Sequence, residues 1–321
     1  MGFPCKKTIH LDLLKMMTIF ILMMTNTQIF TQPVEQKATG KIGEDSDVES
    51  GVYSDMSNET YHSQKDWLSR GGILVLNQSP TRFRYSQMAT GGKSTVAMNV
   101  GSLFHDLVMF GEDFVSKHYL KEPKVNKRTN NGKEELSQFY AMVAENQVVI
   151  PDDDWDLVRY MRDSVARNDL ARELLEHSAT CFEHSHFYTK QVETDAGIQT
   201  VKMRVRPDIK NREFSAIVDL KSIAMNLRWD DAVMNHGYDL QSVMYPDGVS
   251  ESEGWMPENF WFFVTEKTTE NPVTEVFSLD EWHKERGWEQ YRKGMKRFAE
   301  LNQSGDWFMP SVTKRPKWAK D

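Results

Sequence analysis

One short segment constrains the fold more than any other part of the chain. Residues 214–221 (FSAIVDLK) combine apolar side chains, among them Ile217 and Leu220, with the charged Asp219 and Lys221. Such an apolar run is typical of a strand that is covered on both faces. Because charged groups are costly to bury, a central strand seldom carries them unless other groups compensate. The segment therefore predicts a central strand with a functional site on it.

Hydrophobic periodicity changes near residue 180. Before it, apolar residues recur with a helical period over much of residues 55–178. After it, short alternating runs indicate strands, and the first two are separated by a turn at residues 195–197. Strands are expected over residues 181–190, 198–206, 214–221, 260–266 and 273–279, with helices over 228–247 and 280–303. We expect an α/β (α+β) fold in which a helical N-terminal part precedes one central, mixed β-sheet flanked by helices.

Two helix starts are well marked in the N-terminal part. Ser79 precedes Pro80, which places a capping residue before a proline at the first helical position. The helix expected over residues 152–177 opens with three aspartates, which are favourable at a helix N-terminus. Between these helices, residues 100–108 carry an amphipathic apolar stripe, and His105 lies on its flank.

The first 50 residues differ from the rest. A short apolar run, residues 16–24 (MMTIFILMM), follows the basic Lys6 and Lys7. It is short for a transmembrane helix, and no A-x-A cleavage site follows it. Three interpretations remain open: a leader outside the fold, a signal peptide or anchor, and an amphipathic element. We expect a leader and linker over residues 1–50 and one domain over 51–321, with a helical part to about 178, a sheet core over about 180–305 and a basic C-terminal tail.

Charge and cysteine content exclude several classes of protein. The chain has 321 residues, and 39 Lys and Arg against 47 Asp and Glu leave a net charge of −8. That balance argues against a protein that coats nucleic acid by bulk positive charge. Two cysteines, Cys5 and Cys181, are too few for a disulfide scaffold or a four-cysteine metal site, and they fit a cytoplasmic protein without a stable membrane partner. We expect His184 and His186 at the surface, because no third ligand stands at a zinc-site spacing.

Two carboxylates and a lysine are expected to meet at the end of the central strand. Asp219 and Lys221 are two residues apart, so their side chains leave the same face. Asp208 belongs to the preceding hairpin and reaches the same place if the hairpin folds back. Two carboxylates at a strand end suit Mg²⁺, and a lysine beside them can orient a water or steady the charge on a phosphate. Two interpretations of Asp-x-Lys on a strand remain open. One is an exposed pair of side chains on the sheet surface, and the other is a site for metal-assisted hydrolysis of a phosphodiester.

Further polar residues flank this group. Glu183 lies on the first strand of the C-terminal half. Tyr238, Gln241 and Tyr245 are spaced i, i+3 and i+7, so they share one face of the following helix. That face is either a half-buried polar surface or one that contacts a phosphate or a base.

These residues resemble the PDDEXK nuclease superfamily, whose pattern is Pro-Asp, a variable gap and then Asp/Glu-x-Lys. Here the pattern reads Pro207-Asp208 and Asp219-Leu220-Lys221. Within that superfamily, the chain is similar to the C-terminal nuclease domain of the exodeoxyribonuclease VIII (RecE) family from about residue 61 to its end. The similarity is carried by GSLFHDLV (101–108), NKRTNNGKEE (126–135), FEHSHFY (182–188), RVRPDIKNREFSAIVDLKS (204–222), the helix over 238–248 and PKWAKD (316–321).

The resemblance implies a restriction-endonuclease-like core with a metal site. Asp208 and Asp219 would bind the metal ion through their carboxylates. The backbone carbonyl of Leu220 would be a further ligand. His105 resembles the histidine that RecB-like and RecE-like nucleases bring to the metal.

The same resemblance implies roles around that metal site. Lys221 would be the catalytic lysine. Glu183 would be a supporting acid near the metal and its waters. Gln241 and Tyr245 resemble the Gln and Tyr that assist phosphate and substrate positioning in the family.

The family's activity implies what this chain acts on. We expect a Mg²⁺-dependent 5′→3′ exonuclease, with Mn²⁺ as a substitute, that acts on double-stranded DNA ends and leaves 3′ single-stranded tails for prophage recombination. A ring-shaped homotetramer and a RecT-like annealing partner are also implied. The basic segments 121–133 and 314–320 would either contact the DNA backbone or be solvated loops. The alternatives are a nuclease of other polarity or with a single-stranded DNA substrate, a catalytically silent phage DNA-binding protein, and a secreted nuclease.

Overall fold

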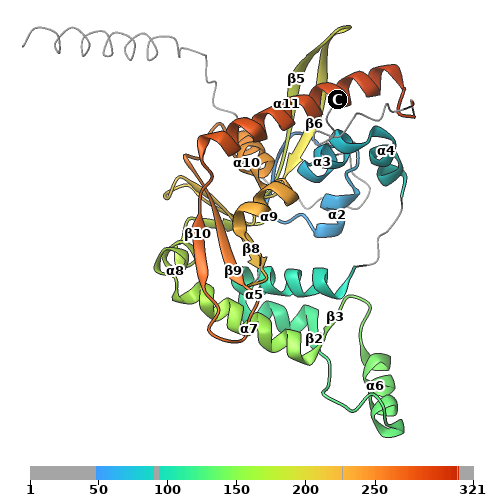
Figure 1. Ribbon diagram of the computed structural model, residues 1–321, viewed down its shortest axis with the longest axis vertical. Helices are drawn as coiled ribbons and strands as arrows, with labels where there is room; N and C mark the ends of the chain where they lie inside the picture. Colours follow the sequence, from blue (N-terminus) through green and yellow to red (C-terminus); the bar gives the residue numbers. More distant parts are fainter. Residues whose placement is uncertain (1–47, 90–93, 226, 309, 311–321) are drawn as a thin grey trace, which may run out of the picture. The chain divides into compact units, whose positions relative to one another are not determined.

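A five-stranded sheet has the charged strand at its centre (Figure 1). The computed structural model describes residues 48–89, 94–225, 227–308 and 310. From edge to edge, the strands are β10 (Thr274–Phe277), β9 (Asn259–Glu266), β8 (Ala216–Ile223), β7 (Ile209–Asn211) and β4 (Thr180–Phe182). β8 is parallel to β9, and the other neighbouring pairs are antiparallel. The predicted fold class, with a central mixed sheet, is confirmed.

Burial of its apolar side chains explains why β8 lies in the middle of the sheet. Val218 and Leu220 are fully buried in an apolar cluster that also contains Leu107 of α5 (Val96–His118). Burying one such side chain contributes about 1.5–3 kcal/mol. Because the strand is drawn into the interior, Asp219 is buried with it and is only 2% exposed.

A second, three-stranded sheet shows that one of the expected strands was wrong. Its order is β1 (Gly51–Tyr53), β5 (Ser185–Thr194) and β6 (Gly197–Val205), all antiparallel. The expected strand over residues 181–190 is in fact two strands, β4 and β5, which belong to different sheets. Between them, Glu183 adopts the left-handed conformation with φ 50°. This conformation ends the extended backbone and redirects the chain.

His186 is fully buried, so its expected surface position was wrong. Its Nδ1 lies 2.8 Å from Oγ of Ser252, which belongs to α10 (Tyr238–Glu253). The first four residues of β5 are all buried, because helix packing covers the second face of this strand as well. Sequence alternation separates the two faces of a strand, but it does not show whether a helix covers the second one.

The N-terminal part is mostly helical, as expected. Ser79 caps α4 (Pro80–Met88), because its Oγ accepts a hydrogen bond from the backbone N–H of Arg82 at 3.2 Å. Pro80 is the first helical residue. Helix α5 bends at Gly111, where φ is 76°. The remaining elements are α2 (Asn58–Ser63), α3 (Arg70–Gln78), α4 (Pro80–Met88), β2 (Tyr119–Lys121), α6 (Asn130–Met142), β3 (Val148–Ile150), α7 (Asp152–Arg167) and α8 (Asp169–Glu176).

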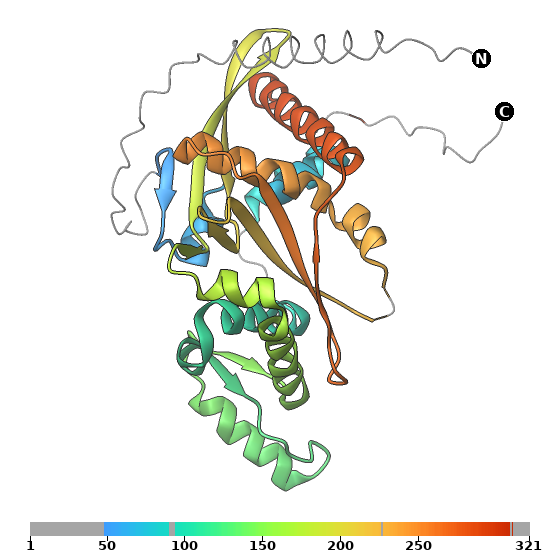
Figure 2. The same cartoon turned by 90° about the vertical axis from the view of Figure 1, so that its left-hand side faces the viewer.

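Two helices replace the single helix expected over residues 228–247. α9 (Trp229–His236) and α10 meet at Gly237, whose φ of 65° is left-handed. A Cβ at this glycine would lie 2.6 Å from Leu74 of α3, so the chain turns here at close range. Figure 2 shows α11 (Glu281–Ser304), in red, beside the β5–β6 hairpin, in yellow. Side chains of α3, α10 and α11 share an apolar cluster with that hairpin.

The expectations about the chain ends fall largely outside the described residues. The apolar run over 16–24, most of the linker and the basic segment 314–320 are among the residues that the structure does not describe. Within the described ranges, no helix has both the length and the apolar character to cross a membrane.

Candidate active site

The ladder between β7 and β8 ends at the residues of the PDDEXK pattern. Its last pair is Ile209 with Val218, so Asp208 and Asp219 follow just beyond it. Here Oδ2 of Asp208 accepts the backbone N–H of Leu220 at 2.7 Å. In an extended strand the N–H and C=O of one residue leave the same edge, so the Leu220 carbonyl also faces the Asp208 side. The expected meeting of the two strand ends therefore occurs.

Asp219 has both carboxylate oxygens engaged. Oδ2 accepts a hydrogen bond from Nζ of Lys221, and Oδ1 accepts one from Nε2 of Gln241 on α10. The other amide atom of Gln241, Oε1, is buried and has no hydrogen-bond partner among the described residues. The site thus presents a buried acceptor oxygen beside a buried carboxylate.

The two carboxyl groups have opposite pKa shifts. Burial, and then the nearby Asp208 carboxylate, raise the pKa of Asp219 despite the attraction of Lys221. Burial acts on Asp208 in the same direction, but His105, Lys221 and the Leu220 N–H outweigh it and lower its pKa. Acids whose surroundings separate their pKa values are typical of functional sites. A divalent cation here would favour the ionised form of both.

His105 reaches this site from α5. Its Nδ1 lies 3.4 Å from Oδ2 of Asp208, and its side chain is 27% exposed. The neighbouring Phe104 is fully buried, which fixes the rotation of the helix about its axis. Burial by itself lowers the pKa of His105, but the Asp208 carboxylate outweighs this and raises it. The histidine is therefore placed to contact whatever Asp208 binds.

Glu183 is the residue in the left-handed conformation between β4 and β5. Its N–H donates to the carbonyl oxygen of Asp208 at 3.0 Å, which ties the redirected chain to the site. Its side chain lines a cavity of about 570 Å³ together with His105 and Asp106. Burial raises the pKa of Glu183, and the Asp208 carboxylate raises it further. Asp208 and Asp219 are not among the described residues that line this cavity, but His105, which contacts Asp208, is one of them.

The two tyrosines of α10 differ in their relation to the site. Nζ of Lys221 lies 4.9 Å from the ring centre of Tyr238, so that ring holds the ammonium on its face. The ring of Tyr245 packs against Phe260 with centres 6.2 Å apart, and no hydrogen bond joins its hydroxyl to another described residue. Burial raises the pKa of Tyr245, so it stays protonated. Tyr245 therefore lies near the carboxylates without contacting them.

The contacts of two residues, Arg206 and Tyr119, were not predicted from the sequence. Arg206 is buried, donates to Oγ of Ser185 at 2.8 Å and to Oδ1 of Asn58 at 2.7 Å, and its guanidinium lies 4.3 Å from the ring centre of Tyr61. It fastens the start of α2 to the strand that leads into Asp208. The position of Arg206 two residues before Asp208 was the only sequence signal for this role. The second contact is the hydrogen bond from Tyr119 to the Asp106 carboxylate at 2.5 Å.

The residues present fit a hard divalent cation. Across the described part of the chain, no three His, Cys, Asp or Glu side chains already surround one point as a metal site. The potential donors are nevertheless mostly oxygens: the Asp208 and Asp219 carboxylates, the Leu220 carbonyl and the unpartnered Oε1 of Gln241, with the ring nitrogen of His105 beside Asp208. Oxygen ligands of this kind are those that Mg²⁺ prefers.

The cations of the basic segment 121–133 are largely paired. Nζ of Lys121 lies 2.9 Å from Asp152 and 2.8 Å from Asp156. Lys124 also contacts Asp152, at 3.3 Å, and Lys127 contacts Glu122 at 2.7 Å. The pairs of Lys121 and Lys124 join the segment to α7, whereas the pair of Lys127 lies within the segment. Together they leave less free positive charge there than the sequence alone suggests.

Comparison with solved structures bears on the fold of the chain. A crystal structure of a candidate exonuclease from Eubacterium rectale has a TM-score of 0.53 and 14% identity, over 82% of this chain and 96% of that chain. It shares the fold. The structure of SSO0001 has a TM-score of 0.23 and 13% identity over 60% of this chain and 84% of that chain, which is too distant to carry an argument. No curated protein matches the chain.

The family itself is shown by a match to most of the described residues. The model of a PDDEXK-like domain of unknown function (DUF3799) matches residues 77–311. This range contains the Pro-Asp and Asp-x-Lys residues, as well as His105, Glu183 and α10. The chain belongs to the family of PDDEXK-like domains of unknown function (DUF3799).

Proposed function

We propose that this chain is a Mg²⁺-dependent nuclease that hydrolyses phosphodiester bonds of DNA. The convergence of Asp208, Asp219 and Lys221 where β7 and β8 part is the observation that carries the proposal. Membership in a PDDEXK-like family supports it. The finer assignment is an exonuclease that degrades linear duplex DNA from 5′ to 3′ and leaves 3′ tails. It is supported by the resemblance to exodeoxyribonuclease VIII.

The two carboxylates would hold the cation next to the scissile phosphate. Mg²⁺, when bound, offsets negative charge on the phosphate and makes the attacking water more acidic. Asp208 is kept in place by the Leu220 N–H and His105, and Asp219 by Gln241. Because these contacts exist before substrate arrives, the oxygens need little rearrangement during the reaction.

Lys221 would act on the reacting phosphate directly. Its ammonium lies between the Asp219 carboxylate and the face of Tyr238. Held in this way, Nζ can donate a hydrogen bond to the attacking water or to a phosphate oxygen. Its positive charge counters the charge that develops on that oxygen.

The remaining residues would support this centre. Glu183 and His105 line the adjacent cavity and can accept or hold protons of water there. Gln241 orients Asp219 through Nε2, while its free Oε1 can accept a hydrogen bond from water. Tyr245 would position the substrate rather than the carboxylates.

We also propose an assembly and a cellular location for the protein, and both rest on the resemblance. We infer a homotetramer that encloses DNA, a RecT-like annealing partner and a cytoplasmic location from the resemblance alone. Light scattering of the purified full chain tests the oligomer. A monomer at micromolar concentration would overturn it.

Digestion of end-labelled DNA tests the proposed activity. With Mg²⁺, we expect the full chain to release the 5′ label of a linear duplex first and to leave a circular duplex intact. Asp219→Ala and Lys221→Ala should be inactive, while Glu193→Gln, an exposed change on β5, should be as active as the parent. Early release of the 3′ label contradicts the polarity. Cleavage of the circle contradicts the exonuclease assignment, and an active, folded Asp219→Ala variant contradicts the site.

A further inference from the structure

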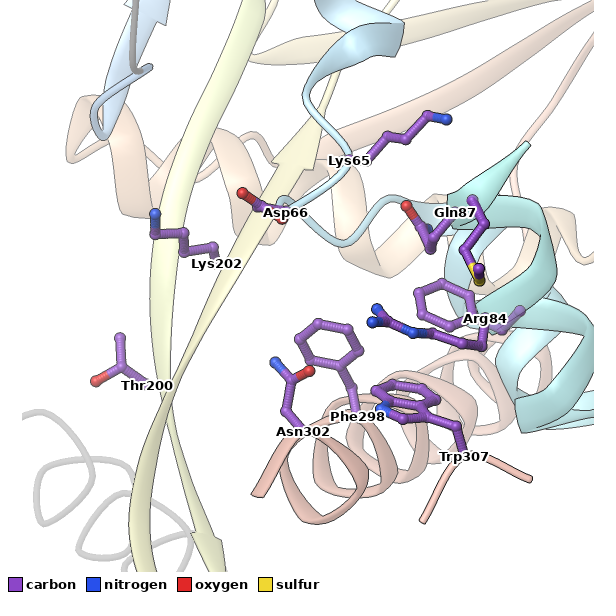
Figure 3. Close-up of a pocket in the computed structure, with 11 residues that line it drawn as sticks. Lys65, Asp66, Arg84, Gln87, Thr200, Lys202, Phe298, Asn302 and Trp307 are labelled. Carbon is purple, nitrogen blue, oxygen red and sulfur yellow. The ribbon is translucent and has the colours of Figure 1, made fainter. Parts of the chain in front are cut away.

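A second cavity, of about 520 Å³, lies between α4, β6 and the end of α11 (Figure 3). Figure 3 shows Lys202 and Thr200 on the strand side, and Arg84, Phe298 and Trp307 on the helical side. The cavity combines two kinds of groups. Its cations are Lys65, Arg84 and Lys202, and its aromatic floor is formed by Phe83, Phe298 and Trp307.

Each cation of this cavity contacts a neutral group of the protein, and Nζ of Lys202 lies 5.3 Å from the ring centre of Trp67. Of the described residues that line it, Asp66 alone is acidic. No ion pair joins Lys65, Arg84 or Lys202 to a carboxylate of the described residues. Lys65 donates to the carbonyl oxygen of Ala89, and the Arg84 guanidinium lies 5.6 Å from the ring centre of Trp307. This differs from the paired lysines near α7 and leaves an excess of positive charge in the cavity.

Three cations lie at alternate positions on the chain that runs from this cavity toward the catalytic residues; Lys202 is exposed, whereas Arg204 and Arg206 are only 7% and 9% exposed. Lys202, Arg204 and Arg206 alternate along β6 and its continuation, so their side chains leave the same face. Asp208 follows two residues later. Asp208 comes six positions after Lys202, a span of at most about 20 Å.

Arg204, the middle one of the three cations, is 7% exposed, and neither its Nε nor its Nη1 finds an acceptor among the described residues. Its guanidinium lies 4.6 Å from the ring centre of Tyr61, the same ring that Arg206 faces. Adjacent His62 lines the cavity that His105 also lines, whereas Lys65 lines the second cavity. A buried cation whose Nε and Nη1 lack acceptors in the described part of the chain thus follows Lys202 on the way to Asp208.

We propose that the second cavity binds a nucleotide unit of single-stranded DNA, from a strand that continues along β6 to the catalytic carboxylates. This inference rests on the proposed nuclease function. The cations would contact phosphates, and the aromatic floor would receive a base or sugar without regard to sequence. A cavity of this size accepts one nucleotide unit and is too small for a duplex. At the duplex rise of about 3.4 Å per nucleotide, the span to Asp208 corresponds to roughly six nucleotides, and fewer in an extended strand.

Binding of a labelled 12-nucleotide thymidine strand tests the assignment. The full chain is used with Ca²⁺ in place of Mg²⁺, and binding is followed by fluorescence anisotropy over a range of salt concentrations. The test variant is Lys202→Gln with Arg84→Gln. The matched control is Arg292→Gln with Lys293→Gln, which removes the same charge from exposed positions on α11. Thermal melting of each variant shows that it is folded.

We expect the test variant to bind the strand about tenfold more weakly and to lose about 1.4 from the salt slope, which is the value for two phosphate contacts. The control should bind within about twofold of the parent. Equal weakening in both variants would overturn the proposal, because it would show a general charge effect. Displacement of the strand by thymidine monophosphate at equal nucleotide concentration would also overturn it, in favour of a free-nucleotide site.

The outcome is separable from that of the proposed function. Digestion of linear duplex with Mg²⁺ is measured on the same preparations. Cleavage by the parent, with no difference in strand binding between the two variants, removes only the strand site. An inactive parent whose strand binding falls in the test variant alone removes the nuclease assignment and leaves the strand site standing.

Discussion

The carboxylate of Asp208 accepts the backbone N–H of Leu220 at 2.7 Å, just beyond the last pair of the β7–β8 ladder. This bond continues the contact between the two strands after their main-chain pairing has ended. The same carboxylate oxygen lies 3.4 Å from His105. One side chain therefore fastens the strand ends together and supplies an anionic oxygen to the site.

These two roles of Asp208 can be separated by substitution. Asp208→Asn keeps an oxygen that can accept the Leu220 N–H, so its melting temperature should stay close to that of the parent. Asp208→Ala leaves that N–H unpaired and should cost about 1–3 kcal/mol in the free energy of unfolding. Both should lose cleavage by on the order of 10²-fold or more, because both lack the charge. Denaturant melts and digestion assays check this, and an active Asn variant contradicts it.

Removing the charge of Lys221 should move the pH dependence of the reaction. The ammonium lowers the pKa of Asp219, which burial otherwise raises. In Lys221→Met the Asp219 carboxyl should hold its proton to higher pH. The acidic limb of the rate–pH profile of any residual activity should therefore shift to higher pH. Lys221→Arg keeps a positive charge, and its limb should stay in place. Rate–pH profiles of the two variants decide this, and an unshifted limb in the Met variant is the contrary result.

The central strand and its charges were predictable because local rules govern them. An apolar run sets the burial of β8, and a two-residue spacing sets which side chains share a face. Asp219 and Lys221 follow from these rules alone. The meeting with Asp208 needed only a hairpin between them.

The errors arose where distant packing decides the outcome. The apolar period continues through Gly237, so one helix was expected, whereas contact with Leu74 of α3 makes the turn. His186 is buried because α10 packs over β5, which no local pattern shows. Arg206 binds Asn58, nearly 150 residues away in sequence. Long-range contacts of this kind are invisible to periodicity.

Glu183→Gln should stabilise the fold while it weakens the site. Burial, and then the Asp208 carboxylate, raise the pKa of Glu183 above its unfolded value of about 4.3. The folded protein therefore loses stability as the pH rises from the unfolded pKa through the folded one. Glutamine removes that loss. Without metal ions, the variant should melt higher than the parent at pH 8 and at the same temperature at pH 4. A lower melting temperature at pH 8 contradicts this, and Glu193→Gln is the exposed control.

Gly287→Ala should separate α10 from α11. A Cβ here would lie 2.2 Å from the carbonyl oxygen of Asp239, and backbone cannot move aside as a flexible side chain can. We expect a loss of about 1–3 kcal/mol in the free energy of unfolding. Cleavage should also be slower, because Gln241 lies only two residues after Asp239 on α10. Gly71→Ala, at an exposed position of α3 where an added Cβ would lie 4.0 Å from Oγ of Ser69, should instead gain up to about 1 kcal/mol. Chemical denaturation compares them, and equal stability of the two variants contradicts the close packing.

Binding of a divalent cation should be visible without any DNA. A ligand that binds only the folded state adds about 2.7 kcal/mol of stability at 100 times its dissociation constant. The melting temperature should therefore rise with Mg²⁺ concentration, and a chelator should reverse the rise. Asp208→Asn combined with Asp219→Asn should abolish the effect, because both anionic ligands are gone, while Glu193→Gln should preserve it. A rise of the same size in the double variant would place the cation elsewhere on the protein.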